Sequence, residues 1–215
     1  MGLIHKMTFV PRFMRQLFYK PFNRLFFKSA GCVIGRNFLA YNRVYLKVYR
    51  NANVVIGDNF TLRSGDGINP LSGGIKSSIF VNENASLVIG NGVGMSSPTI
   101  RCNESIEIKD NVNIGALVTI IDTDSHSLDF RIRRIGGNED LKAARNKPIL
   151  IEEDCLIGAH SIIMKGVTIG ARSVIGAGSV VTRDIPSDSI AAGNPCKVIK
   201  KINIKDEGTT DKPSI

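Results

Sequence analysis

Apolar residues recur every six positions between residues 151 and 186, a period that neither an α-helix nor a simple strand produces. The leading position of each unit is always β-branched, which favours strands. These positions are Ile151, Ile157, Ile163, Ile169, Ile175 and Val181. Six residues suffice for one short strand and one tight turn, so three units bring the chain back to its start as a three-sided coil. The period predicts a prism of stacked coils with these side chains inside.

Weaker copies of the same pattern occur upstream. Ile108, Ile114 and Ile120 stand six apart, and so do Ile56, Leu62 and Ile68. Gly, Asn and Asp tolerate the positive φ angles that tight corners require. They cluster between the apolar positions, as in Gly57-Asp58-Asn59, Gly90-Asn91 and Asp110-Asn111. We therefore predict one β-helix domain over residues 31–201.

Two stretches interrupt the six-residue register. One is short, around residues 69–78, and the other is a polar stretch at residues 122–147. Long loops that leave a regular scaffold often carry function. The second stretch is therefore where we expect the chemistry.

The two ends of the chain do not repeat. Residues 1–30 form a basic, aromatic segment with apolar residues at helical spacing, and Pro11 and Pro21 predict that any helix there is broken into short pieces. Residues 202–215 are polar and have no period, which indicates a frayed tail.

The net charge of +9 is concentrated near the N-terminus. Ten Lys and Arg residues precede Asp58, which is the first acidic residue of the chain. Three interpretations of segment 1–30 remain open: a cap on the end of the prism, a contact with an anionic inner membrane, or nucleic-acid binding. Because no nucleic-acid-binding motif accompanies the charge, we expect no nucleic-acid partner.

The cysteine pattern and the hydropathy indicate the cellular compartment in which the protein is expected. Cys32, Cys102, Cys155 and Cys196 are scattered and form no C-x-x-C pair, so free thiols in a reducing cytoplasm are expected. No apolar run approaches the ~20 residues of a membrane span.

Two segments resemble the hexapeptide-repeat acyltransferases, closest to the maltose/galactoside acetyltransferase-like group and the O-acetyltransferases of capsule and exopolysaccharide synthesis. They run from Asn113 to His126, ending in I-D-T-D-S-H, and from Ile157 to Lys201, including I-G-A-H-S-I-I-M-K-G-V-T-I-G and A-G-N-P. The resemblance implies an all-β fold: a left-handed parallel β-helix with a protruding loop and short helical N- and C-terminal segments. It also implies a homotrimer in a bacterial cytoplasm, with acetyl-CoA in the groove between neighbouring prisms.

The same resemblance places the catalytic residue at His126. A hydroxyl group is too weakly acidic to attack a thioester unaided at neutral pH, and a neutral imidazole within hydrogen-bond reach can take its proton. A nearby carboxylate would orient the ring and stabilise its charged form. Asp124 and Asp122 are both candidates, and the sequence does not choose between them.

The substrate residues follow by matching motifs. Ala159 and Ala177 match positions where the family's backbone meets the pantetheine arm. Thr182, Arg183, Lys197 and Lys200 match donor-site positions, the two lysines facing CoA phosphates. Asn103 and Arg101 are candidate acceptor contacts. The chain departs from the family at Leu156, where Trp is common, and at Asn103, where the sugar acetyltransferases have an acidic residue.

These residues predict an acetyl-CoA-dependent O-acetyltransferase acting on a sugar or polysaccharide precursor. Two alternatives remain: an N-acetyltransferase acting on an amino-sugar nucleotide, and a β-helix binding scaffold without catalysis. A zinc lyase built on the same helix would need three converging histidines. His5, His126 and His160 lack the required spacing, so no metal is expected.

Overall fold

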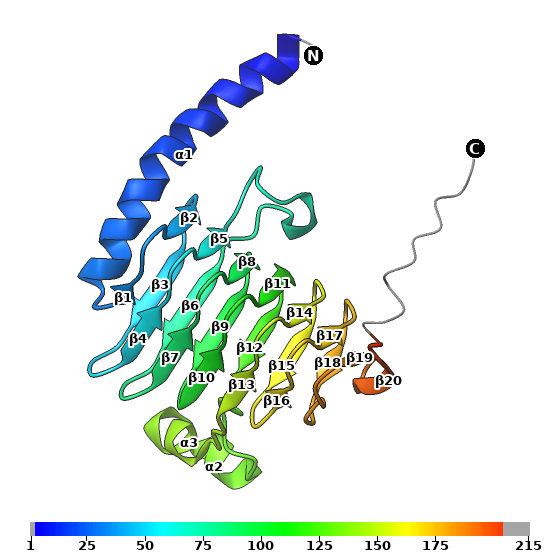
Figure 1. Cartoon of the computed structure of the whole chain (residues 1–215). Helices are drawn as coiled ribbons and strands as arrows, with labels where there is room; N and C mark the ends of the chain where they lie inside the picture. The colour runs from blue at the N-terminus through cyan, green and yellow to red at the C-terminus, as the bar shows by residue number, and fades with distance from the viewer. Residues whose placement is uncertain (1–2, 204–215) are drawn as a thin grey trace.

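The computed structural model describes the backbone of residues 3–203 and the side chains of residues 14–203. Its strands form three sheets, and in each sheet the strand number rises by three from one neighbour to the next up to β17. Every third strand therefore returns to the same wall, and the walls enclose a prism (Figure 1). All strand pairs are parallel except β19–β20. The predicted three-sided parallel coil is confirmed.

The strands are short, as a six-residue unit requires. Sheet A contains β1 (Val33–Ile34), β4 (Asn53–Ile56), β7 (Ser86–Ile89), β10 (Ser105–Ile108), β13 (Ile149–Ile151) and β16 (Thr168–Ile169). Sheet B contains β2 (Leu39–Tyr41), β5 (Thr61–Arg63), β8 (Gly94–Ser96), β11 (Asn113–Ala116), β14 (Leu156–Ile157), β17 (Val174–Ile175), β19 (Ser189–Ala192) and β20 (Lys197–Lys201). Sheet C contains β3 (Tyr45–Val48), β6 (Ser78–Val81), β9 (Thr99–Cys102), β12 (Thr119–Ile121), β15 (Ile162–Met164) and β18 (Val180–Val181).

The six-residue positions fill the interior of the prism. Ile151 pairs with Ile169, Ile157 with Ile175 and Ile163 with Val181 in neighbouring strands. All six side chains are at most 1% exposed. Burying one such side chain stabilises the fold by roughly 1.5–3 kcal/mol, so the period read from the sequence is also the main stabilising element of the prism.

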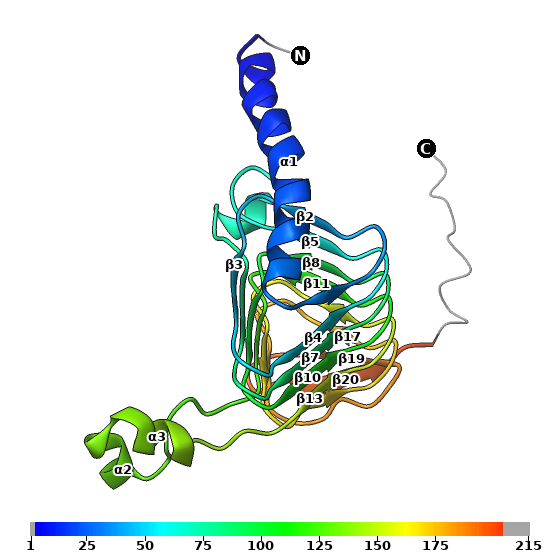
Figure 2. The ribbon, with the colours of Figure 1, turned by 90° about the vertical axis from the view of Figure 1, so that its left-hand side faces the viewer.

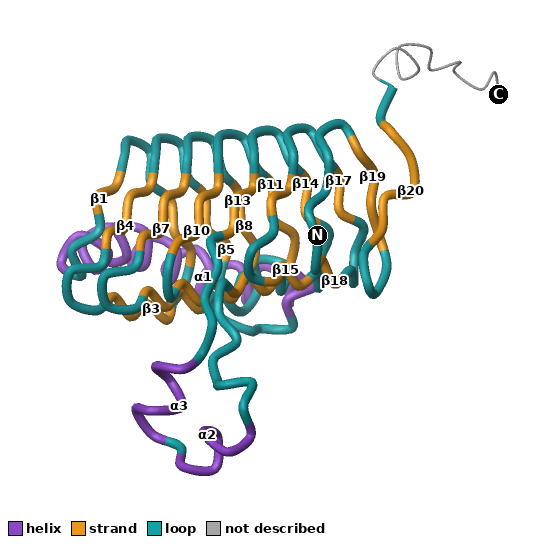
Figure 3. The backbone as a smooth tube through the Cα atoms, turned by 90° about the horizontal axis from the view of Figure 1, so that it is seen from below, coloured by secondary structure: helices purple, strands orange, loops and turns teal. Residues whose placement is uncertain are grey.

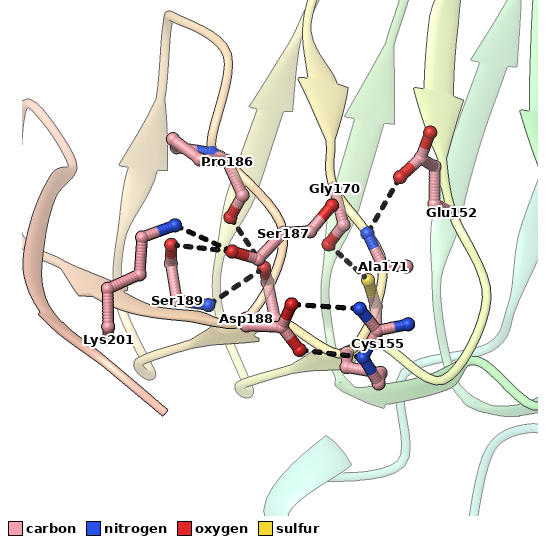
Figure 4. Close-up of polar contacts among 11 residues, drawn as sticks. Glu152, Cys155, Gly170, Ala171, Pro186, Ser187, Asp188, Ser189 and Lys201 are labelled. Carbon is pink, nitrogen blue, oxygen red and sulfur yellow. Dashed lines mark hydrogen bonds and ion pairs between the residues drawn. The ribbon is translucent and has the colours of Figure 1, made fainter. Parts of the chain in front are cut away.

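The corner between sheets A and B uses left-handed backbone in successive coils. It contains Asn37, Asn59, Asn111, Asp154 and Asp188, all with φ between 53° and 60°. Arg172 takes the same conformation (φ 60°), and its guanidinium Nε donates to Asp188 Oδ1 at 2.6 Å. Figure 4 shows further ties between coils at this corner, including Lys201 Nζ to the Ser187 carbonyl at 2.7 Å.

A short insertion leaves the prism between β5 and β6. It contains the 3-10 helix η1 (Pro70–Ser72) and four glycines with positive φ, namely Gly65, Gly67, Gly73 and Gly74. Ile68 was expected to continue the register of Ile56 and Leu62. It lies in this insertion instead, because the chain leaves the coil directly after Arg63.

The N-terminal segment forms one long helix rather than the short pieces expected from its prolines. Helix α1 spans Leu3–Ser29 and continues through Pro21. Proline removes one helical hydrogen bond, and contacts between α1 and the first coil of the prism offset that loss. Asn23 Nδ2 donates to the carbonyls of Ala40 and Asn42 at 2.9 and 2.7 Å, and Phe27 is fully buried. The C-terminal end of α1 thereby covers the open end of the prism (Figure 2).

The C-terminal segment is a strand where a short helix was expected. The turn at Gly193–Cys196 reverses the chain, and β20 then pairs antiparallel with the edge strand β19. An edge strand offers unpaired N–H and C=O groups, which explains why this segment extends rather than coils. Of the tail predicted at 202–215, residues from 204 onward lie outside the described residues. No helix among the described residues has the length and apolar character needed to cross a membrane.

Candidate active site

Candidate polar residues from four coils meet at the corner between sheets C and A. Strands β9, β12, β15 and β18 are neighbours in sheet C and end at this corner. The residues that follow them are Asn103, Asp122, Lys165 and Thr182. Residues 122–148 leave the prism here as a loop that projects well beyond the walls (Figure 3). Coil stacking thus assembles on one edge residues that are up to 79 positions apart in the chain.

Two short helices shape the projecting loop. Helix α2 (Phe130–Ile135) is capped by Asp129, whose side chain accepts the N–H of Arg131 at 2.9 Å. Helix α3 (Gly137–Ala143) returns toward the prism, and a bridge between Thr123 and Asn146 closes the base of the loop. This return path brings α3 back beside the residues that open the loop.

His126 pairs with Asp140, which lies in α3. Its Nδ1 is 2.6 Å from Asp140 Oδ2, and Asp140 Oδ1 accepts the Ser127 N–H at 2.7 Å. The hydrogen bond from His126, followed by that from Ser127, holds the pKa of Asp140 below its usual value. An ionised carboxylate only accepts hydrogen bonds, so Nδ1 carries a proton, and in the neutral imidazole Nε2 has a free lone pair. The His126 side chain is 63% exposed, whereas that of Asp140 is 7% exposed.

Asp122 and Asp124, the expected partners of His126, have other partners. Asp122 is fully buried, and its two carboxylate oxygens accept the N–H groups of Asn103 and Glu104 at 2.7 and 2.8 Å. Burial raises the pKa of Asp122, against the opposing effect of these hydrogen bonds. Asp124 Oδ1 lies 3.1 Å from Lys165 Nζ. Asp122 and Asp124 therefore anchor the base of the loop, and the carboxylate at His126 is Asp140.

Asp140 is the site residue that sequence reasoning missed. It lies 14 residues after His126, and no local motif joins the two positions. The loop also contains Asp129 and Glu139, so composition alone offers three carboxylates downstream. The course of the chain through α2 and α3 brings only one of these three carboxylates, that of Asp140, back to His126 near the start of the loop.

The residues expected at the donor site fall into two groups. Thr182, Arg183 and Lys197 line a cavity of about 370 Å³ together with Pro195 and Cys196. Lys200 lies further along β20, opposite Ile190. The guanidinium of Arg183 and the ammonium of Lys197 make this cavity suitable for an anionic ligand such as a phosphate.

The second donor group lies at the corner between sheets B and C. Ala159 and Ala177 stack there in successive coils, with the Gly178 N–H donating to the Ala159 carbonyl at 2.8 Å. Their small side chains leave the backbone of this corner accessible to an extended ligand. Leu156, which stands where the resembling family often has Trp, is 48% exposed on β14.

The candidate acceptor residues carry polar atoms with no partner. Arg101 Nε and Asn103 Oδ1 are buried, and neither makes a hydrogen bond to any residue that the structure describes. The Arg101 guanidinium lies 5.1 Å from the centre of the Phe80 ring. An unpaired buried polar atom is costly, so these atoms are candidates for contact with a polar ligand at the same corner as the loop.

Comparisons with known proteins agree with this architecture. Residues 148–183 match the family described as hexapeptide repeat of succinyl-transferase. The galactoside O-acetyltransferase of Escherichia coli (strain K12) is 43% identical over 109 residues, which cover 51% of this chain and 50% of that protein. The chain thus spans about half the length of the curated relatives it matches.

Solved structures extend the similarity over more of the chain. A galactoside acetyltransferase in complex with coenzyme A is 31% identical, with a TM-score of 0.54, and the match covers 84% of this chain and 70% of that one. The polySia specific acetyltransferase NeuO is 30% identical, with a TM-score of 0.51, over 77% of this chain and 72% of that one.

Proposed function

The chain belongs to the hexapeptide-repeat acyltransferases, and from that premise we propose that it transfers an acetyl group from acetyl-CoA to a hydroxyl of a sugar or polysaccharide precursor. One observation carries the proposal: a largely exposed imidazole, His126, stands on a projecting loop with its Nδ1 held by the buried carboxylate of Asp140 at 2.6 Å. This arrangement is that of a general base.

The proton path follows from the tautomer of His126. Its free Nε2 takes the proton of the acceptor hydroxyl while the new C–O bond forms at the acetyl carbon. The C–S bond to CoA then breaks, and the imidazolium returns the proton to the departing sulfur. Asp140 stabilises the imidazolium between these two transfers and keeps the ring oriented. Acetyl-CoA supplies the activated acetyl group as its thioester.

The donor site would form between neighbouring copies of a homotrimer of left-handed coils, as in the family. Arg183 and Lys197 are positioned to bind CoA phosphates, with Lys200 further along β20, and Thr182 lines the same cavity. Ala159 and Ala177 would leave room for the pantetheine arm along the backbone. The similar galactoside acetyltransferase is in complex with coenzyme A, which supports the assignment of the donor.

The acceptor is proposed to be a glycan hydroxyl. Two of the relatives are named for a galactoside and for polySia as acceptor. Arg101 Nε and Asn103 Oδ1 provide one donor and one acceptor for ring hydroxyls near the corner that carries the loop. An amine acceptor would use the same base, so a screen that pairs each sugar with its amino-sugar counterpart separates O-transfer from N-transfer.

The direct test replaces the base. We expect His126→Ala to lower the rate of acetyl transfer by about 10²- to 10⁴-fold, the usual contribution of a general base. The trimer should persist because the side chain is 63% exposed, and the melting temperature should fall only by the contribution of the His126–Asp140 hydrogen bond. Transfer is followed as CoA thiol released in the presence of a sugar acceptor.

The matched control is the exposed corner histidine. His160 has a φ of 61°, so His160→Asn removes an imidazole and keeps a residue that tolerates this conformation. This variant should retain wild-type turnover. Wild-type turnover in His126→Ala would refute the assignment of the base. Absence of any acetyl transfer by the wild-type protein would instead favour the scaffold alternative.

A further inference from the structure

Helix α1 packs on the prism by one face and exposes an apolar stripe on the opposite face. The packed face contains Asn23, which hydrogen-bonds to the first coil, and Phe27, and both are fully buried. The outer face exposes five large apolar side chains, by 44–69% of their surface. These are Met14, Leu17, Phe18, Phe22 and Leu25. A continuous exposed apolar patch marks an interaction surface.

The exposed residues form one continuous stripe. Their spacing of three and four residues places them on the same side of α1. The rings of Phe18 and Phe22 stack with centroids 5.4 Å apart and planes 18° apart. Figures 1 and 2 show that α1 extends past the first coil, so the stripe lies clear of the prism walls. The surface is thus preformed and accessible from outside.

Cations border this stripe. Arg24 and Lys28 lie along one side by helical position. Arg15 lies on the other side, where its guanidinium donates to the Asp66 carbonyl of the insertion at 3.2 Å. The first 28 residues contain six Lys and Arg and no Asp or Glu. Aromatic and aliphatic side chains flanked by cations fit the interface of an anionic bilayer, where rings enter the headgroup region and ammonium groups meet lipid phosphates.

We propose that the outer face of α1 docks on an anionic phospholipid membrane surface. A second copy of the chain is the main competing occupant. Packing two or three such helices against one another would bring together like charges with no acidic residue to balance them. Charge complementarity therefore favours lipid. The proposal concerns where the protein resides and does not depend on the acetyl-transfer chemistry.

The test is co-sedimentation of the full chain with vesicles. We expect binding to vesicles of equal parts phosphatidylcholine and phosphatidylglycerol, and little binding to pure phosphatidylcholine. Phe18→Glu with Phe22→Glu should weaken binding by about tenfold or more, because each replaces buried apolar area with charge. Arg24→Gln with Lys28→Gln should weaken it by about fivefold per cation removed, and added salt should reproduce that loss.

The control is Ile135→Glu, which alters an equally exposed apolar residue (67%) on the projecting loop at the far end of the molecule. It should bind vesicles like the wild type. Circular dichroism and size-exclusion chromatography with light scattering show whether each variant keeps its fold and oligomeric mass. Vesicle binding that survives the Phe18/Phe22 change would overturn the proposal. The proposal would also fail if the wild type did not bind vesicles and the Phe18/Phe22 variant lost oligomeric mass. That result would identify a second copy of the chain as the occupant of the stripe.

Discussion

At the scale of single residues, the proposed chemistry depends on which nitrogen of His126 carries a proton. Asp140 decides this, because its carboxylate faces Nδ1 at 2.6 Å and its pKa is held below the usual value by His126 and Ser127. The side chain that carries Nε2 is 63% exposed to solvent. A carboxylate in this place would also stabilise the imidazolium in the proposed transfer.

Replacing Asp140 tests this dependence. Asp140→Asn should reduce kcat/KM for acetyl transfer by about 10²- to 10⁴-fold, because a neutral amide neither stabilises the imidazolium nor enforces the tautomer. Glu139→Gln is the matched control, since it removes the neighbouring exposed carboxylate of the same helix turn. Equal rates for both variants would show that Asp140 has no role in orienting the base.

The lowered pKa of Asp140 also predicts how stability depends on pH. A carboxyl whose pKa is lower in the folded state contributes stability above its unfolded pKa, and this contribution disappears as pH falls through the lowered folded value. The difference in melting temperature between wild type and Asp140→Asn should therefore be largest near neutral pH and vanish in acid. Thermal melts over a pH series measure it, and a difference independent of pH would contradict the prediction.

At the scale of elements, the fold depends on the sharp turns at the corners between sheets. Each coil must turn sharply between sheets A and B, and the chain uses Asn or Asp in the left-handed region at most of these turns. Asn111 has a φ of 58° and an exposed side chain. Its role is therefore conformational rather than a matter of packing.

We expect Asn111→Ala to destabilise the fold by about 1 kcal/mol, the approximate cost of placing an alanine in left-handed backbone. Asn111→Gly should have at most a small effect, because glycine adopts this conformation freely. Chemical denaturation of the three proteins supplies the comparison. If Ala and Gly variants are equally stable, the corner does not depend on backbone preference.

Stacking of coils brings the site together at the scale of the whole molecule. The loop with His126, Asn103 and the Thr182–Arg183 step directly follow strands of sheet C at one corner of the prism, and Arg101 lies within β9 of the same sheet. In the proposed homotrimer, the loop of one copy would reach the donor cavity of its neighbour. Catalysis would then require two chains.

Mixing two inactive variants tests the shared site. His126→Ala and Arg183→Glu with Lys197→Glu should each be inactive alone. Trimers assembled from both should recover about a quarter of wild-type turnover, because some interfaces pair an intact base with an intact donor cavity. Light scattering of the wild type should give the mass of three chains. No recovery from mixed trimers of the expected mass would place both parts of the site within one chain.

Much of the fold and part of the site can be read from the chain itself. The positions of Ile151 through Val181 predict the buried core because a six-residue period is a local property that every coil repeats. The break in that period at residue 122 marks the projecting loop, and His126 stands near its start. Arg183 and Lys197 were expected at the donor site, and the structure places them around one cavity.

Tertiary structure alone decided the remaining features, because each depends on contacts between segments whose spacing no local pattern encodes. The choice of Asp140 over Asp122 and Asp124 depends on the return path of α3. Helix α1 continues through Pro21 because Asn23 and Phe27 dock on the first coil. The sequence thus determined the repeating scaffold and the residue types available for chemistry, and packing determined which of those residues face one another.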